Sequence, residues 1–143
     1  MKLNFELVPD SCWYSNLRSL LKPGMWDVVR KDAYARAGGK CMICGKPVRT
    51  LEAHEQWEYD EKKAVQKLKG VIAVCHDCHS VIHIGRTQLM GDEDKAIKHF
   101  MEVNACSYAD YIKELGKANA DDARRNKISE WSLDLLWLRR FGE

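Results

Sequence analysis

Proline and net charge are both scarce in this sequence. Only 3 of the 143 residues are Pro, and 23 basic side chains nearly balance 21 acidic ones, which leaves a net charge of +2. With 45% hydrophobic residues, this is the composition of a folded protein, and the length suits one domain over residues 1–143. A charge so close to zero does not by itself mark a nucleic-acid-binding protein.

Long apolar runs are also missing. No stretch approaches the roughly 20 apolar residues that a membrane span needs. The N-terminal stretch MKLNFELVPDSCW has no long apolar core typical of a secretory signal. We therefore expect no membrane association and a cytoplasmic location. Thiols stay reduced there, so the six Cys indicate metal binding or catalysis before disulfides.

Apolar periodicity predicts a mixture of helices and short strands. Helices are expected over 16–21, 25–37, 77–84, 92–104 and 107–118, and strands over 48–55 and 71–74. The polar segment 56–63 is expected to be a loop, and 65–68 a helical turn. Residues 131–138 alternate Trp and Leu, but Leu136 and Leu138 blur the period, so strand and helix both stay open there.

Two Cys-x2-Cys pairs form the most specific motif. They are Cys41, Cys44, Cys75 and Cys78. A two-residue gap lets one tight turn direct both thiolates at one ion, and two such turns complete a tetrahedral zinc site. Buried free thiols or two redox pairs are the alternatives, and the paired turns favour zinc. Cys12 and Cys106 stand alone and are expected to be ordinary buried cysteines.

Three histidines accompany the cysteine pairs. His79 and His83 are four residues apart, so one face of a helix carries both. His54 lies on the strand expected between the pairs, and a strand–turn–strand–helix unit would bring it close to His83. Imidazoles and carboxylates hold a divalent ion with open positions, and a neutral His deprotonates water, so the set suits a hydrolytic metal site. A capped or solvated side chain is the alternative for each His. His76 and His99 are expected to be surface or packing residues.

The stretch CMICGKPVRTLEAHE, followed by VIAVCHDCHSVIH, resembles the HNH endonucleases, the ββα-metal nucleases. The flanking patterns HEQWEYD and LDLLWL resemble bacterial and phage proteins of this kind. The resemblance implies an α+β fold: a small ββα-metal core over 25–90, stapled by a structural zinc, with flanking N-terminal helices and a C-terminal helical extension over 91–143. It also implies that the protein acts in the cytoplasm of a bacterial or phage-infected host cell.

The resemblance further implies a role for each His. His54 matches the general base that activates water for attack on phosphate. His83 matches a ligand of the catalytic ion, Mg²⁺ or Mn²⁺, and His79 matches the family's His after the last Cys. The implied reaction is hydrolysis of DNA phosphodiester bonds, leaving a 5′ phosphate, and the implied partner is DNA.

The chain departs from the family pattern at two positions. Ala53 stands where the family places a metal-binding Asp or His, and the family's Asn before the second cysteine pair is missing. Glu52, Glu55 and Asp60 are candidate ligands in place of the Asp. We expect Glu52 and Glu55 to face away from His54 in a regular strand, so that a bulge or strand end at His54 would be needed to combine them.

These departures leave a second function open. The chain would then be a catalytically inactive zinc protein of the same fold that binds nucleic acid or a protein, for example a phage inhibitor of a host factor. A third function, thiol redox chemistry, is disfavoured by two Cys pairs beside His. The sequence does not decide between monomer and homodimer.

Basic side chains supply the expected contacts to a phosphate backbone. The candidates lie in the segment between the cysteine pairs and near the C-terminus: Lys62, Lys63, Lys67, Lys69, Arg124 and Arg125. An ordinary solvated surface is the alternative, because acidic residues are nearly as numerous.

Overall fold

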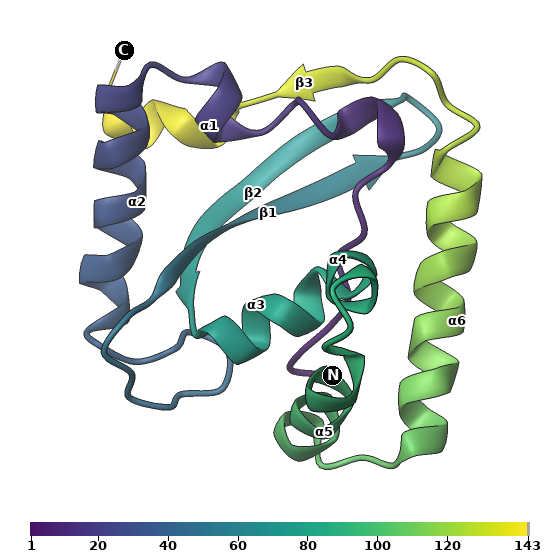
Figure 1. Cartoon of the computed structure of the whole chain (residues 1–143). Coiled ribbons are helices and arrows are strands. Elements are labelled where there is room, and N and C mark those ends of the chain that lie inside the picture. The colour runs from purple at the N-terminus through teal and green to yellow at the C-terminus, as the bar shows by residue number, and fades with distance from the viewer. Residues whose placement is uncertain (143) are drawn as a thin grey trace.

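The chain folds around a three-stranded sheet (Figure 1). The computed structural model describes residues 1–142. β1 (Glu52–Asp60) and β2 (Val65–Val74) form an antiparallel hairpin, and β3 (Ser132–Asp134) pairs parallel with the start of β2. The hairpin turn closes because the Asp60 carboxylate accepts hydrogen bonds from the amides of Lys62 and Lys63 at 3.1 and 3.0 Å. The strand order β1-β2-β3 leaves β1 at one edge.

Helices cover both faces of the sheet and give the chain a mixed α/β fold. They are α1 (Leu17–Leu20), α2 (Pro23–Ala37), α3 (His76–Ile82), α4 (Ile84–Leu89), α5 (Glu93–Asn104) and α6 (Tyr108–Arg125), with 3-10 turns η1 (Asp10–Cys12) and η2 (Leu136–Phe141). None of the described helices is long and apolar enough to cross a membrane.

Two hydrophobic clusters hold these layers together. One contains Val74, Val81 and Phe100, and joins the sheet to α3, α5 and α6. The other contains Val29 and Leu68, and joins the opposite face to α1, α2 and η2. The sheet is therefore buried on both faces over much of its area, which fixes the side from which each strand residue projects.

Most of the expected elements are confirmed, although the strand expected over 48–55 begins only at Glu52 and the helix expected over 77–84 ends at Ile82. Two other expectations are wrong. Residues 56–60 extend β1 instead of forming a loop, and 65–68 begin β2 instead of a helical turn. The segment 131–138 divides between a short strand and a 3-10 turn, so the expected helical extension over 91–143 also adds β3 to the sheet. The core expected over 25–90 therefore shares its sheet with β3, which comes from the C-terminal part of the chain.

The N-terminal segment, residues 1–16, lies against α3 and α5. The amide of Leu3 donates to Asn104 Oδ1 at 2.9 Å, and Asn104 returns a hydrogen bond to the Leu3 carbonyl. Phe5 stacks on Phe100 with ring centroids 5.0 Å apart. The amide of Glu6 then donates to the carbonyl of Ile82 at 2.9 Å. These contacts position residues 4–8 beside the last turn of α3.

The helix α6 borders the molecule on the side away from α2 (Figure 1). A capping box of Ser107 and Asp110 begins it, and Tyr111 buries its ring against Phe100 near that end. At the other end, Arg124 and Arg125 approach the carboxylate of Glu61, in the β1–β2 turn, at 3.1 and 3.4 Å. Both ends of α6 are thus tied to the rest of the fold.

Candidate metal centres

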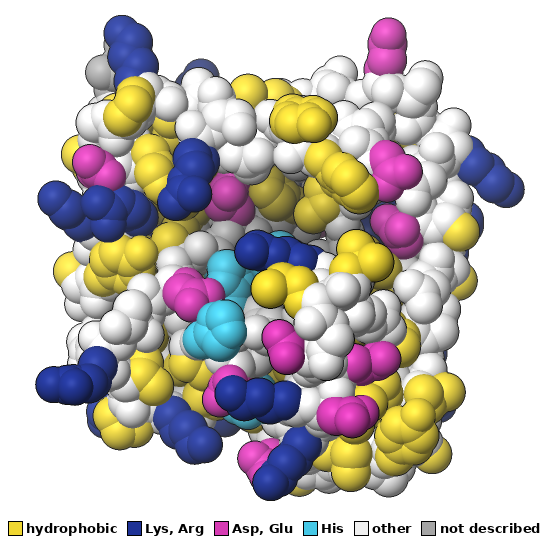
Figure 2. Space-filling view, in the orientation of Figure 1, with side chains coloured by type: hydrophobic (Ala, Val, Ile, Leu, Met, Phe, Trp, Pro, Cys, Tyr) yellow, Lys and Arg dark blue, Asp and Glu magenta, His cyan; other side chains and the backbone are white. Residues whose placement is uncertain are grey.

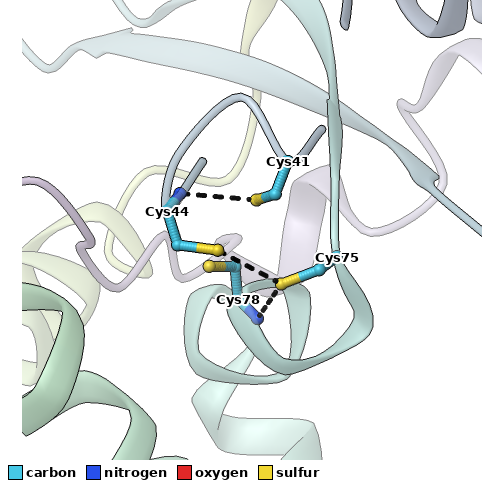
Figure 3. Close-up of side chains that lie close together, drawn as sticks. All are labelled: Cys41, Cys44, Cys75 and Cys78. Carbon is cyan, nitrogen blue, oxygen red and sulfur yellow. Dashed lines mark hydrogen bonds between the residues drawn. The ribbon is translucent and has the colours of Figure 1, made fainter. Parts of the chain in front are cut away.

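Four cysteines from two separate turns converge at the start of α3 (Figure 3). Cys41 and Cys44 come from the turn that follows α2, and Cys75 and Cys78 from the first turn of α3. Their Sγ atoms all lie within 4.8 Å of one another, and those of Cys44 and Cys75 are 3.8 Å apart. A regular tetrahedron with Zn–S bonds of about 2.3 Å also has sulfur–sulfur edges of about 3.8 Å. The expected cysteines therefore cluster as a possible zinc site.

Backbone amides support the thiolate form of these cysteines. The amides of Ile43 and Cys44 point at Cys41 Sγ at 3.4 and 3.5 Å, and the amide of Cys78 points at Cys75 Sγ at 3.4 Å. Burial and then repulsion from Cys41 and Cys75 raise the pKa of the Cys78 thiol. A cation among the four sulfurs would offset this repulsion, so the donor set fits a structural zinc.

His99 touches this cluster, although the sequence predicts only a surface or packing role for it. Its Nε2 atom lies 3.2 Å from Cys78 Sγ, and the residue is 7% exposed. A ring N–H directed at a ligating thiolate is a common outer contact of metal sites. The sequence shows only a single His within the expected helix 92–104, and no local pattern links it to the cysteines.

A second cluster contains His54, His79 and His83. His54 projects from β1, His79 from α3, and His83 is the residue that ends α3. The ring centroid of His54 lies 5.4 Å from those of His79 and His83, which are themselves 4.8 Å apart. One nitrogen of each ring lies within 4.8 Å of the others. The expectation that the hairpin and helix bring His54 close to His83 is confirmed.

The environments of His79 and His83 favour the neutral imidazole, which is the form that binds a metal. Burial, followed by repulsion from His79 and His54, lowers the pKa of His83 to about 3. Burial also lowers the pKa of His79. His54 is only 3% exposed, and its buried Nε2 atom has no hydrogen-bond partner within residues 1–142. A buried nitrogen without a partner destabilises the fold, and a metal ion would supply one.

Glu52 supports the histidine cluster. Its Oε1 atom lies 2.7 Å from His79 Nδ1, and its Oε2 atom lies 3.0 Å from His76 Nδ1. Burial raises the pKa of Glu52, but the hydrogen bonds with His79 and His76 outweigh it and keep that pKa below its usual value. A carboxylate on the far ring nitrogen is the usual partner of a metal-binding His, because it fixes the ring orientation.

The expectation that Glu52 and Glu55 both face away from His54 is wrong for Glu52. Residues two apart on a strand project from the same face, so Glu52 lies on the side of His54 and Glu55 on the other. No bulge at His54 is needed, because the irregularity in the pairing of β1 with β2 falls between Gln56 and Trp57.

The other two candidate acidic ligands are used elsewhere. Glu55 accepts a hydrogen bond from the amide of Leu17 at 2.5 Å, at the start of α1, and burial raises its pKa. Asp60 binds the amides of the hairpin turn. Neither belongs to the histidine cluster.

Glu6 is the carboxylate that faces the cluster. Its Oε2 atom lies 3.1 Å from His54 Nε2, and its side chain is 34% exposed. No sequence motif points to Glu6, because it precedes the cysteine and histidine motifs by a long stretch of chain. Only the packing of the N-terminal segment against α3 brings it to the site.

An open cleft leads to the histidines. Its volume is about 1450 Å³, and it is lined by residues of the N-terminal segment, β1, α4 and α6. Figure 2 shows the hollow on this face, with histidine side chains and both basic and acidic side chains around it. Arg18 and Arg86 line the cleft, and α6 contributes charges of both signs: Glu114, Lys117, Asp121, Asp122 and Arg125.

The basic residues expected to contact DNA fall into two groups. Lys62, Lys63, Lys67 and Lys69 are exposed on the hairpin. Arg124 and Arg125 instead pair with Glu61, Arg124 also pairs with Asp121, and the guanidinium of Arg125 lies 5.1 Å from the centre of the Tyr59 ring. The two arginines therefore bind α6 to the hairpin turn, while the four lysines are exposed to a ligand.

The site thus has two parts: a cysteine cluster that joins the turn after α2 to α3, and a histidine cluster that faces a cleft. The sequence motifs named seven of these side chains, and the structure adds Glu6 and His99. Comparisons with protein-family models, curated proteins and solved structures found no match to this chain.

Proposed function

We propose that this chain is a metal-dependent endonuclease of the ββα-metal type, which hydrolyses phosphodiester bonds in DNA. The observation that carries the proposal is the convergence of His54, His79 and His83, in reach of one another, at an open cleft. Three converging imidazoles, one of them with a buried nitrogen that has no hydrogen-bond partner, have little structural use without an ion, because an unpaired buried nitrogen costs free energy. Such a triad beside an open cleft suits metal-assisted hydrolysis.

The order of the elements supports the same proposal. A hairpin carries one His on its first strand, and the helix that follows carries the other two. The cysteine cluster ties the start of that helix to the turn before the hairpin. This is the arrangement that the resemblance to the ββα-metal nucleases implies, with the zinc as a structural element and the chemistry at the histidines.

A divalent ion bound there would polarise the phosphate and lower the pKa of a bound water molecule. The chain's own contribution would be to hold the three imidazoles in position and to keep those of His79 and His83 neutral. Glu52 orients His79, and burial keeps the imidazole of His83 unprotonated. A set of imidazoles favours transition ions, whereas Mg²⁺ prefers oxygen ligands, so Mn²⁺ suits this site better than Mg²⁺.

We assign His54 as a ligand in this proposal, in place of the general base that the resemblance implies. A general base must reach the substrate's water, whereas His54 is 3% exposed and lies equally far from His79 and His83. The missing Asp or His at Ala53 then matters less, since His54 supplies the strand's contribution to the ion.

Nicking of supercoiled plasmid DNA tests the proposed activity. The parent should nick the plasmid in Mn²⁺ and lose this activity in a chelator that leaves the zinc in place. His83→Ala should abolish nicking, while His76→Ala, a change at an exposed His outside the triad, should keep most of it. A parent that nicks neither duplex nor single-stranded DNA in Mg²⁺, Mn²⁺ or Ni²⁺ would refute the proposal.

A binding module without catalytic activity is the second candidate. The observation in its favour is the wall of the cleft on α6, which carries charges of both signs and so offers no continuous basic surface to a phosphate backbone: Glu114, Lys117, Asp121, Asp122 and Arg125. Such a wall of mixed charge suits a protein partner better than DNA. Pull-down of a defined host partner by both the parent and His83→Ala, without any nicking, would favour this candidate.

A further inference from the structure

We propose that Glu6 is the fourth ligand of the ion held by His54, His79 and His83, so that the N-terminal segment completes the metal site. The proposal rests on the proposed function only in that both need an ion at these histidines. It does not require that the substrate be DNA.

The distance between Glu6 and His54 fits two ligands of one ion. Oε2 of Glu6 lies 3.1 Å from Nε2 of His54, yet the direction of approach does not make a hydrogen bond, and that nitrogen has no other partner in residues 1–142. Two atoms bound to one ion at about 2.1 Å, at angles between octahedral and tetrahedral, lie about 3.0–3.4 Å apart. Both atoms would then point at a shared position and not at each other.

The position of Glu6 is fixed by contacts that do not involve its carboxylate. Its amide donates to the carbonyl of Ile82, the residue before His83, and the neighbouring Phe5 stacks on Phe100. The backbone is therefore held beside the end of α3 whether or not an ion is bound. No Lys or Arg of the described chain forms an ion pair with Glu6, so its carboxylate is available.

The other acidic residues near the site are already committed. Glu52 binds His79 and His76, and Glu55 accepts a hydrogen bond from the amide of Leu17. Glu6 is thus the carboxylate left to offset the charge of the ion. Three imidazoles and one carboxylate are a donor set for Mn²⁺, Co²⁺, Ni²⁺ or Zn²⁺, and the cleft side stays open for water and a phosphate oxygen.

The test measures Mn²⁺ binding directly, by the loss of the free-ion signal in electron paramagnetic resonance. Mn²⁺ is the chosen probe because thiolates select zinc, so the cysteine cluster keeps its metal. Glu6→Gln should weaken Mn²⁺ binding about 10- to 100-fold, with zinc still at one per chain. Glu114→Gln is the matched control, since it removes the same charge from the same cleft, and it should keep the parent's affinity.

A second variant distinguishes the loss of a ligand from misfolding of the chain. Glu6→Asp keeps the carboxylate on a shorter side chain, so it should bind Mn²⁺ more tightly than Glu6→Gln at equal thermal stability. Glu6→Gln with the parent's Mn²⁺ affinity would overturn the inference and leave the nuclease proposal standing. A parent that binds no Mn²⁺ beyond the zinc-retaining His83→Ala variant would also overturn it. Glu6-dependent Mn²⁺ binding without any DNA cleavage would support the inference and count against the nuclease.

Discussion

The carboxylate of Glu52 accepts a hydrogen bond from Nδ1 of His79 at 2.7 Å, across the junction between β1 and α3. The strand thus sets the orientation of a ring on the helix. With Nδ1 engaged, Nε2 is the nitrogen left to face a ligand. This pairing ties the hairpin and the helix together at the histidine cluster, and it makes Glu52 a positioning residue.

Removal of the Glu52 carboxylate should therefore loosen the ion without removing a ligand. We expect Glu52→Ala to weaken Mn²⁺ binding about 10- to 100-fold, because the His79 ring loses its orienting partner. Glu58→Ala is the matched control, since Glu58 is exposed on the same strand. The Mn²⁺ affinities of the two variants are compared by titration, with the free ion detected by electron paramagnetic resonance. Equal affinities for the two variants would contradict the positioning role of Glu52.

His54→Ala distinguishes a ligand from a general base. As a ligand, His54 is needed for binding, so the variant should lose both Mn²⁺ affinity and DNA nicking while zinc stays at one per chain. Metal analysis, Mn²⁺ titration and plasmid nicking make the three measurements. A variant that binds Mn²⁺ like the parent but does not nick would restore the role of base, and one as active as the parent would remove His54 from the mechanism.

The cysteine cluster should contribute stability and no catalysis. Cys44→Ala should release the zinc and lower the free energy of unfolding by roughly 3 kcal/mol or more, a fall in Tm of about 10 °C or more. Cys106→Ala is the control, because Cys106 lies outside the cluster. Zinc content and calorimetry check both variants. A Cys44→Ala chain that keeps its zinc would exclude the four-cysteine site.

Salt dependence of DNA binding should separate the exposed lysines from the paired arginines. Combining Lys67→Ala with Lys69→Ala should reduce the slope of log affinity against log salt by about 1 for each phosphate that no longer has a lysine beside it. Arg124→Ala should leave the slope unchanged, because that guanidinium already pairs with Glu61 and Asp121. The reverse result would mean that the arginines leave Glu61 to bind DNA.

Local spacing made most of the candidate metal ligands predictable. Two thiols on one tight turn, and two imidazoles four residues apart on a helix, are brought together by backbone geometry alone. The hairpin was less obvious, since 56–63 is rich in charge. Its alternation was nonetheless present: exposed Glu58 lies between the less exposed Trp57 and Tyr59, and exposed Lys67 between buried Gln66 and Leu68. A search for period two in the sequence would have identified β1, where Trp57 and Tyr59 alternate with polar residues, but not the start of β2, where the buried residue alternating with Leu68 is the polar Gln66.

Glu6 and His99 could not be predicted in this way. Each reaches its cluster through packing between distant segments: Glu6 through the contact of Phe5 with Phe100, and His99 through the docking of α5 on α3. Neither residue lies in a local motif. The sequence therefore indicates the inner part of each site, and tertiary contacts supply the rest.

The anchoring of α6 has a dimensional consequence. Its 18 residues are about 27 Å long, and about 20 Å of that length separates the Tyr111 packing near one end from the Glu61 ion pairs at the other. One wall of the cleft is thus a rod of fixed length. Inserting one helical turn would lengthen that wall by about 5.4 Å. The chain must then either release Glu61 or widen the cleft. The length of α6 therefore helps to set the size of ligand that the cleft admits.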